Sequence, residues 1–295
     1  MGNLVTMAQD DKAEQTLAEA NPKSVFGIIV HSFFIIPFLI AVFCVILFTA
    51  ISLLTREQQT AYDLLNDVKI GGLTKRWQAA FELSKILANP KLIPPEERFS
   101  TELIKAFRQS KQDDSRVRQY LALAMGRTGN SIYLAPLING IAQEKQENLY
   151  AIIYALGMLK DPGANHVLYE YLQNPNARLR SLTVVAIGNI GSQNSIEYFK
   201  KALNDSEPNV KWGSAISLAK LGDSSGQDIL LQLLSRNYFT GFPEVDPEEQ
   251  TQLMLTAIDA ATPLNLPRLT EQIRHLSTTD QNMKVRAKAL TALGN

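Results

Sequence analysis

The sequence is poor in the residues that carry metal and thiol chemistry. Its 295 residues include one cysteine and three histidines. Cys44 and His31 lie inside a long apolar run, whereas His166 and His275 stand far apart in the rest of the chain. Without cysteine, a soluble domain has no disulfide, no cysteine-rich zinc site and no thiol nucleophile. We therefore expect no metal ion and no cofactor.

Net charge is lacking as well. The chain has 29 Lys and Arg residues against 29 Asp and Glu residues. A balanced chain has no long-range field that attracts nucleic acid, so we expect no nucleic-acid partner. The short motifs of common enzyme sites, such as HExxH, CxxC, GxGxxG and GxSxG, are missing too. We therefore predict that the protein is not an enzyme.

Acidic and basic residues are missing altogether from residues 25–54. A membrane-spanning helix needs about 20 apolar residues, and a buried soluble helix would show a polar stripe. A signal peptide has a shorter apolar core and a small-residue cleavage site, but no A-x-A motif follows this run. We predict a transmembrane helix over residues 25–54, a polar tail over 1–24 and a soluble domain over 55–295.

The flanking charges predict how this span is oriented. Two lysines in the tail stand among four acidic residues, whereas the basic residues after the span are Arg56, Lys69, Lys75 and Arg76. An excess of Lys and Arg marks the cytoplasmic side. We expect a single-pass protein of a bacterial inner membrane with its C-terminal domain in the cytoplasm. His31 has two interpretations, a side chain at headgroup depth or a contact to a partner membrane subunit.

A repeat occupies the soluble part. Similar segments start at positions 117, 148, 179 and 210, and so recur every 31 residues. Small residues stand at the seventh position after each start (Ala124, Ala155, Ala186 and Ser217) and at the ninth (Gly126, Gly157, Gly188 and Ala219). The twelfth position holds Gly129, Lys160, Gly191 and Gly222. Small residues let neighbouring helices approach closely, and the last column suits helix C-caps.

Each unit is predicted to be a pair of helices. Apolar residues at 20 and 24 positions after each start, such as Leu137 with Ile141, are four apart and share one helix face. The pattern continues at Met254 and Val285, and a looser pair precedes Val117. We therefore expect an all-α fold, an α-solenoid of about seven helix pairs that follows one transmembrane helix.

The segments VRQYLALAMGRTG and VRAKALTALG, which open at Val117 and Val285, resemble the bacterial HEAT-like repeats first described in phycobilisome-lyase proteins. The resemblance covers roughly Thr55 to the C-terminus and implies an α-solenoid. It implies little about function, because such repeats occur in chromophore lyases, in an iron hydroxylase and in many scaffolds. The hydroxylase relatives use His-Glu steps as metal ligands, and this sequence has no His-Glu dipeptide.

Two features are candidates for partner binding. The residue after each start is often basic, namely Arg118, Arg180, Lys211 and Arg286. This column either bridges to an acidic or carbonyl group of the adjacent unit, or forms a basic ridge that docks an acidic partner or lipid headgroups. The second feature is an insertion of 13 residues within 236–249, which contains Tyr238, Phe239, Phe242, Glu244 and Asp246. It is either a projecting contact loop or a loop folded back onto the solenoid.

These features together predict a scaffold. We expect an accessory subunit of a membrane complex, of transporter or secretion type, that binds other membrane subunits through its span and a soluble protein through the solenoid surface. Two alternatives are a membrane-associated enzyme similar to the chromophore lyases and a module that binds anionic lipid surfaces.

Overall fold

The computed structural model describes residues 31–54, 59–142 and 144–294, with the side chains of 31, 32 and 52–54 left aside. The chain divides into two compact units, Met1–Gln58 and Gln59–Asn295. The predicted tail over residues 1–24 and the first six residues of the predicted span lie outside the described residues.

Unit 1 contains one long apolar helix. A short π-helix, η1 (His31–Ile35), leads into α3 (Ile36–Leu54). Together they contain a segment of 19 residues, Phe33–Ile51, that is long and apolar enough to cross a membrane, by length and composition alone. Pro37 lacks an N–H and its ring crowds the preceding turn, and the wider π turn just before it is a usual local adjustment to such a residue. At about 1.5 Å per residue, α3 is roughly as long as a bilayer's hydrocarbon core is thick.

Unit 2 consists of helix pairs, and its described residues contain no strand. The pairs are α4 (Ala61–Ile70) with α5 (Leu73–Ile86), α6 (Glu97–Gln109) with α7 (Ser115–Arg127), α8 (Leu134–Ile141) with α9 (Gln146–Leu159), α10 (Asn165–Tyr171) with α11 (Ala177–Ile190), α12 (Ile196–Ala202) with α13 (Pro208–Lys220), α14 (Gln227–Leu233) with α15 (Pro247–Ala261), and α16 (Pro267–Thr279) with α17 (Met283–Ala292). Seven pairs confirm the predicted solenoid.

Short 3₁₀ helices fill many of the connections: η2 (Pro90–Leu92), η3 (Ser110–Gln112), η4 (Ser131–Tyr133), η5 (Pro162–Ala164), η6 (Gln193–Ser195), η7 (Ser224–Gly226), η8 (Arg236–Gly241) and η9 (Thr262–Leu264). The repeat period is visible in the helices themselves, because α7, α9, α11 and α13 begin at positions 115, 146, 177 and 208, each 31 residues after the last.

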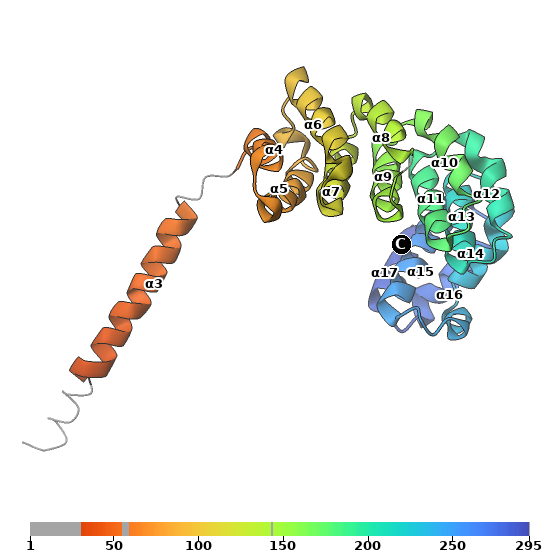
Figure 1. Ribbon diagram of the computed structural model, residues 1–295. Helices are drawn as coiled ribbons and strands as arrows, with labels where there is room; N and C mark the ends of the chain where they lie inside the picture. The colour runs from red at the N-terminus through yellow and green to blue at the C-terminus, as the bar shows by residue number, and fades with distance from the viewer. Residues whose placement is uncertain (1–30, 55–58, 143, 295) are drawn as a thin grey trace, which may run out of the picture. The chain divides into compact units, whose positions relative to one another are not determined.

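The helices of unit 2 form two layers. The odd-numbered helices, α5 to α17, contact one another in chain order, and each also contacts a helix of the even-numbered layer. Within unit 2 the stack curves, with the odd-numbered helices on the inner side and α8, α10 and α12 on the outer side (Figure 1). The buried apolar residues between the layers form two clusters that meet at α13.

The small-residue columns explain how closely the inner helices stack. A Cβ atom added to Gly126 would come within 2.7 Å of the Cα atom of Ala155, and one added to Gly157 within 2.6 Å of the Cα atom of Ala186. The ninth position of one repeat therefore meets the seventh position of the next. A larger side chain at either position would force two helices apart.

The C-cap column has the backbone conformation that its glycines predict. Gly129, Gly191 and Gly222 adopt φ angles of 65°, 72° and 81°. Lys160 occupies the same column with a φ angle of 54°, a left-handed conformation that costs a residue with a Cβ atom about 1 kcal/mol or more. The repeat geometry therefore overrides the residue's own preference at this position.

Candidate interaction surface

The basic column lies at the junctions between helix pairs. Arg118 and Arg180 are each the fourth residue of an inner helix, α7 and α11. Arg118 pairs with Glu144 and Arg180 with Asp205, and both carboxylates belong to the turn of the following helix pair. The structure thus supports the bridging interpretation of these two arginines, in which each ties one pair to the next.

Arg118 is buried, with a side chain only 3% exposed. Its Nη1 donates to the carbonyl oxygen of Phe107 at 2.8 Å, and its guanidinium lies 4.3 Å from the centre of the Phe107 ring. Burial would raise the pKa of Glu144, but hydrogen bonds from Asn148, from the Lys145 N–H and from Arg118 outweigh it and hold that pKa below its ordinary value. The interpretation of Arg118 as part of a surface ridge for partners or lipid headgroups is wrong, because its side chain is almost completely buried.

The Arg180 pair is bidentate. Its Nε and Nη2 each donate to one carboxylate oxygen of Asp205 at 2.8 Å, and its Nη1 donates to the carbonyl oxygen of Asn174 at 2.9 Å. The hydrogen bond from Arg180 lowers the pKa of Asp205, against the effect of burial. Nε, Nη1 and Nη2 of Arg180 thus all donate to groups within the stack. The interpretation of Arg180 as part of a ridge for lipid headgroups is therefore wrong as well.

The remaining members of the column behave differently. Arg286 is half-buried and donates from Nη1 to the carbonyl oxygen of Asp280 at 2.6 Å, in the turn that precedes its own helix. Lys211 is half-buried and its charge contributes to the lowered pKa of Asp205. A partner role for these two stays a prediction.

One bridging arginine escaped the sequence reasoning. Arg76 is the fourth residue of α5 and pairs with Asp113, in the turn of the next helix pair. It therefore occupies the same place in its repeat as Arg118 and Arg180. The looser pattern before position 117 hid this equivalence, although counting from the helix start would have revealed it.

The insertion packs onto the solenoid. Phe239 is 2% exposed, and its ring meets Trp212 of α13 with centroids 6.2 Å apart. Tyr238 accepts a hydrogen bond from Trp212 Nε1 at 3.1 Å, and Phe242 packs edge-on against the same indole. A projecting aromatic contact loop is therefore wrong for Phe239, and the three rings instead cover apolar surface of α13. Four aromatic rings together bury a large area, which explains the fold-back.

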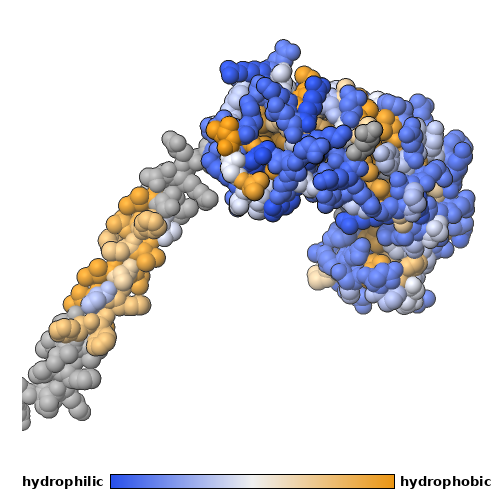
Figure 2. Space-filling model, viewed as in Figure 1, coloured by the Kyte–Doolittle hydropathy of each residue, from blue (hydrophilic) through white to orange (hydrophobic). Residues whose placement is uncertain are grey.

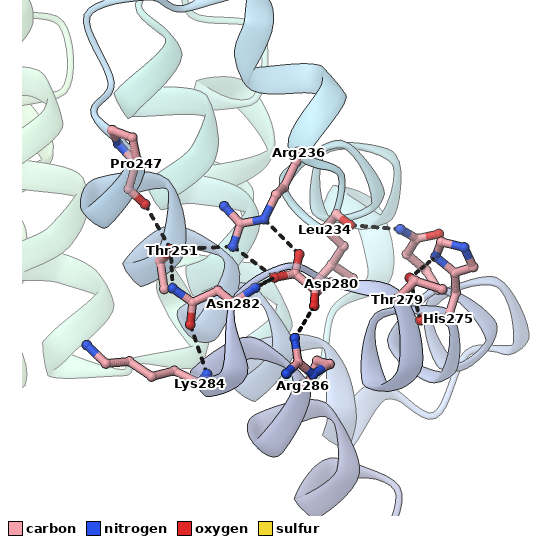
Figure 3. A network of polar contacts seen from close by, with 11 residues as sticks. Leu234, Arg236, Pro247, Thr251, His275, Thr279, Asp280, Asn282, Lys284 and Arg286 are labelled. Carbon is pink, nitrogen blue, oxygen red and sulfur yellow. Dashed lines mark hydrogen bonds and ion pairs between the residues drawn. The ribbon is translucent and has the colours of Figure 1, made fainter.

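A buried ion pair ties the insertion to the last repeat. Arg236, the first residue of η8, pairs with Asp280, which lies in the turn before α17 (Figure 3). Asp280 also accepts from the backbone N–H of Asn282 at 2.8 Å, and Asn282 Nδ2 donates to Thr251 of α15 at 3.4 Å. The network joins η8, α15 and α17.

The acidic residues of the insertion remain on the surface. Glu244 and Asp246 are exposed, and Asp246 caps α15 by accepting from the N–H groups of Glu248 and Glu249. A partner contact through Glu244 and Asp246 stays a prediction. His31 begins η1, but its side chain lies outside the described residues.

The inner layer presents an apolar surface that the sequence reasoning missed. Six side chains, which we call the inner stripe, are exposed or half-buried on the middle of four adjacent inner helices: Phe81, Tyr120, Leu123, Tyr154, Leu182 and Val185. Because inner helices contact neighbours on both sides and the outer layer behind, their open side is the inner surface of the curve. The members on α7, α9 and α11 recur three or six residues after the repeat starts, which is the signal that could have found them.

Two members of the inner stripe touch across neighbouring helices, and an arginine lies close to a further ring of α9. The Phe81 and Tyr120 rings meet with centroids 5.1 Å apart across α5 and α7. Tyr154 and Val185 are each 41% exposed. The Arg178 guanidinium lies 4.7 Å from the centre of the Tyr150 ring at the edge of the stripe. Contiguous exposed apolar side chains with a polar rim are typical of protein-binding surfaces.

No metal centre is found among the described residues, where no three His, Cys, Asp or Glu side chains come together. His166 is exposed, and its Nδ1 lies 2.7 Å from the carbonyl oxygen of Gly163, while His275 contacts Thr279. A cavity of about 440 Å³ adjoins the Arg180 pair, but its strongest charges already neutralise each other.

Comparison with known proteins supports the class of fold. Residues 165–239 match the family of HEAT repeats. The CpcE–CpcF complex of phycocyanin lyase from a Nostoc species is similar in structure, with a TM-score of 0.57, 20% identity, 81% of this chain covered and 88% of that chain. An archaeal HEAT-like repeat protein from Thermococcus onnurineus gives a TM-score of 0.45 and 16% identity, over 80% of this chain and 97% of that one. No curated protein matches the chain.

These findings define the class. The chain is an α-solenoid of stacked helix pairs with one long apolar helix before it. Its repeats are HEAT-like, as the resemblance implied, and the likeness to phycocyanin lyase establishes the fold alone.

Proposed function

We propose that the protein is a non-catalytic, membrane-anchored scaffold that holds a soluble partner protein on its inner stripe. The observation that carries the proposal is the stripe itself, which leaves aromatic and aliphatic side chains open on four adjacent helices. A soluble domain gains nothing from such exposure unless another surface covers it. Tyrosine and phenylalanine are also the residue types that anchor interfaces best.

The charges of unit 2 support a structural rather than a chemical role. Its most buried ion pairs, such as Arg118 with Glu144 and Arg180 with Asp205, lie at the junctions between repeats. A catalytic acid or base would instead need a titratable group facing an open cleft. Because these ion pairs join each helix pair to the next, they fix the curvature of the stack and hold the inner surface in one shape.

The apolar helix supplies the anchor in this proposal. Residues 33–51 span a bacterial inner membrane, and unit 2 lies in the cytoplasm, beside the other subunits of a transporter or secretion-type complex. The span contacts those subunits, while the solenoid holds the soluble component. The scaffold thereby raises the local concentration of that component at the membrane.

The test is co-isolation from native membranes in mild detergent. Tyr154→Asp and Val185→Asp place a charge in the inner stripe, and each should lower the yield of the bound partner at least about tenfold, because a buried unpaired charge costs several kcal/mol. Ile132→Asp is the matched control, since Ile132 is 42% exposed but lies in η4, outside the inner layer. Equal partner yields from all these proteins would contradict the proposal.

A further inference from the structure

The turn between α4 and α5 carries two strongly exposed aliphatic side chains. Ile70 is the last residue of α4 and Leu73 the first residue of α5, and each is 74% exposed. Only Gly71 and Gly72 separate them. We call residues 70–73 the apolar turn. Figure 2 shows apolar surface at this N-terminal end of unit 2.

The fold of unit 2 does not need these side chains. Helix α4 buries Ala61, Leu64, Leu65 and Val68, a complete stripe at helical spacing, and Ile70 lies off that stripe. The residues between the helices of four other pairs are polar, with sequences SKQDD at 110–114, QNPN at 173–176, NDSE at 204–207 and DQN at 280–282. The first residue of α17, Met283, is exposed like Leu73, but no apolar residue stands in the turn before it. Terminal repeats of solenoids normally end in polar surface, so the first pair departs from the rule where it follows the apolar helix.

We infer that the apolar turn inserts into the headgroup boundary of the membrane that α3 spans. The inference rests on the anchor in the proposed function. Six residues lie between Leu54 at the end of α3 and Ala61 at the start of α4, so these two residues are at most about 25 Å apart. Helix α4 has ten residues and is about 15 Å long, which keeps the turn within reach of the bilayer surface.

The tether and the flanking charges indicate that the apolar turn contacts lipid. A short tether holds the turn near the bilayer at an effective concentration of about millimolar, so two aliphatic side chains suffice where a free domain would need more. Lys69 and Lys75 flank the turn. Each has an acid partner, Glu102 for Lys69 and Asp67 for Lys75, so the contact is apolar rather than electrostatic and needs no anionic lipid.

This contact gives the anchor a second point of attachment. A single tether leaves a domain free to rotate above the membrane, whereas a tether at one end of α4 and an inserted turn at the other end restrict that rotation. The inner stripe would then face a constant direction relative to the bilayer.

The test is fluorescence quenching by lipids that carry a spin label near the headgroup, in zwitterionic vesicles that contain the full chain. A fluorophore is attached to Leu73→Cys in a Cys44→Ser background. The control is Met283→Cys, because Met283 is the first residue of α17 and is 75% exposed. Quenching at position 73 should exceed quenching at position 283 at least about threefold if the side chain sits at the acyl boundary. Equal quenching at the two positions would overturn the inference.

Two further measurements distinguish insertion of the apolar turn from anchoring by α3. A fluorophore on Cys44 of the unaltered protein reports the span, using lipids labelled deeper in the chain. Quenching at Cys44 without quenching at position 73 would support the membrane anchor and contradict insertion of the apolar turn. No quenching at either position would contradict both. Adding Ile70→Asp to the labelled Leu73→Cys protein should abolish the signal while circular dichroism stays unchanged, since Ile70 lies outside the core. A signal that survives this change would also overturn the inference.

Discussion

The guanidinium of Arg236 donates two hydrogen bonds to the carboxylate of Asp280, with Nε 2.8 Å from Oδ2 and Nη2 2.9 Å from Oδ1 (Figure 3). The pair joins the start of the insertion to the turn before α17. In α7 and α11 the fourth helical residue is the arginine that reaches the next turn, but α15 has Gln250 there. The insertion thus supplies the cation that the sixth repeat lacks, and forms part of the stack.

Removing that cation should loosen the C-terminal end. Arg236→Ala leaves the Asp280 side chain, which is 2% exposed, without its charged partner. Breaking a buried pair in this way costs about 3–5 kcal/mol. Hydrogen exchange should therefore become faster in α16 and α17 and remain unchanged in α7. The control is Arg268→Ala, which breaks an exposed pair with Asp228 and costs less than about 1 kcal/mol. Similar protection in both variants would show that the Arg236 pair contributes nothing.

The close approach of inner helices predicts a second effect. Gly157→Ala places a methyl group against the backbone of Ala186, so we expect a loss of about 1–3 kcal/mol in the free energy of unfolding. Gly241→Ala is the control, because no atom lies within 4 Å of the added Cβ and its φ angle is not left-handed. Thermal unfolding of the two variants in the same detergent measures the difference. Equal unfolding temperatures of Gly157→Ala and Gly241→Ala would mean that α9 and α11 do not pack closely at this point.

A change at Lys160 should stabilise the protein instead of destabilising it. Its left-handed backbone is the one that glycine adopts at the equivalent positions 129, 191 and 222. Lys160→Gly should therefore stabilise the protein by about 0.5–1 kcal/mol, as relief of backbone strain outweighs the entropy of the unfolded chain. Lys160→Ala keeps a Cβ atom and removes only the charged stem, so it should show no comparable gain. The midpoint of urea unfolding distinguishes the two.

Asp205 makes one junction sensitive to acid. The hydrogen bond from Arg180 holds the pKa of Asp205 below its ordinary value, so the pair's stabilisation is complete above about pH 4 and is lost as the pH falls through the lowered pKa. Asp205→Asn should be less stable than the unaltered protein at pH 7 by about 1–3 kcal/mol. That gap should close as the pH falls below about 4. A gap that is constant over this range would show that the Asp205 charge does not matter.

The solenoid could be predicted from the sequence because its constraints repeat. The small-residue columns report helix contacts that recur every 31 residues, and Gly191 or Gly222 reports a local backbone angle. The fate of the insertion could not be predicted in the same way. Whether Phe239 projects or folds back depends on its packing against Trp212, a contact across 27 positions that no local pattern records. The inner stripe was missed because an exposed Tyr154 resembles a core residue until the curvature of the stack is known.

Site-specific photo-cross-linking tests the central claim most directly. A photoreactive residue is placed at Tyr154 on the inner stripe or at Tyr198 on α12 of the outer layer, two positions that are 41% and 39% exposed. Each full-length protein is irradiated in native membranes, and the cross-linked products are separated by mass. We expect a discrete adduct with a soluble protein from position 154 and none from position 198. Adducts of equal yield from both positions, or an adduct from position 198 alone, would contradict it.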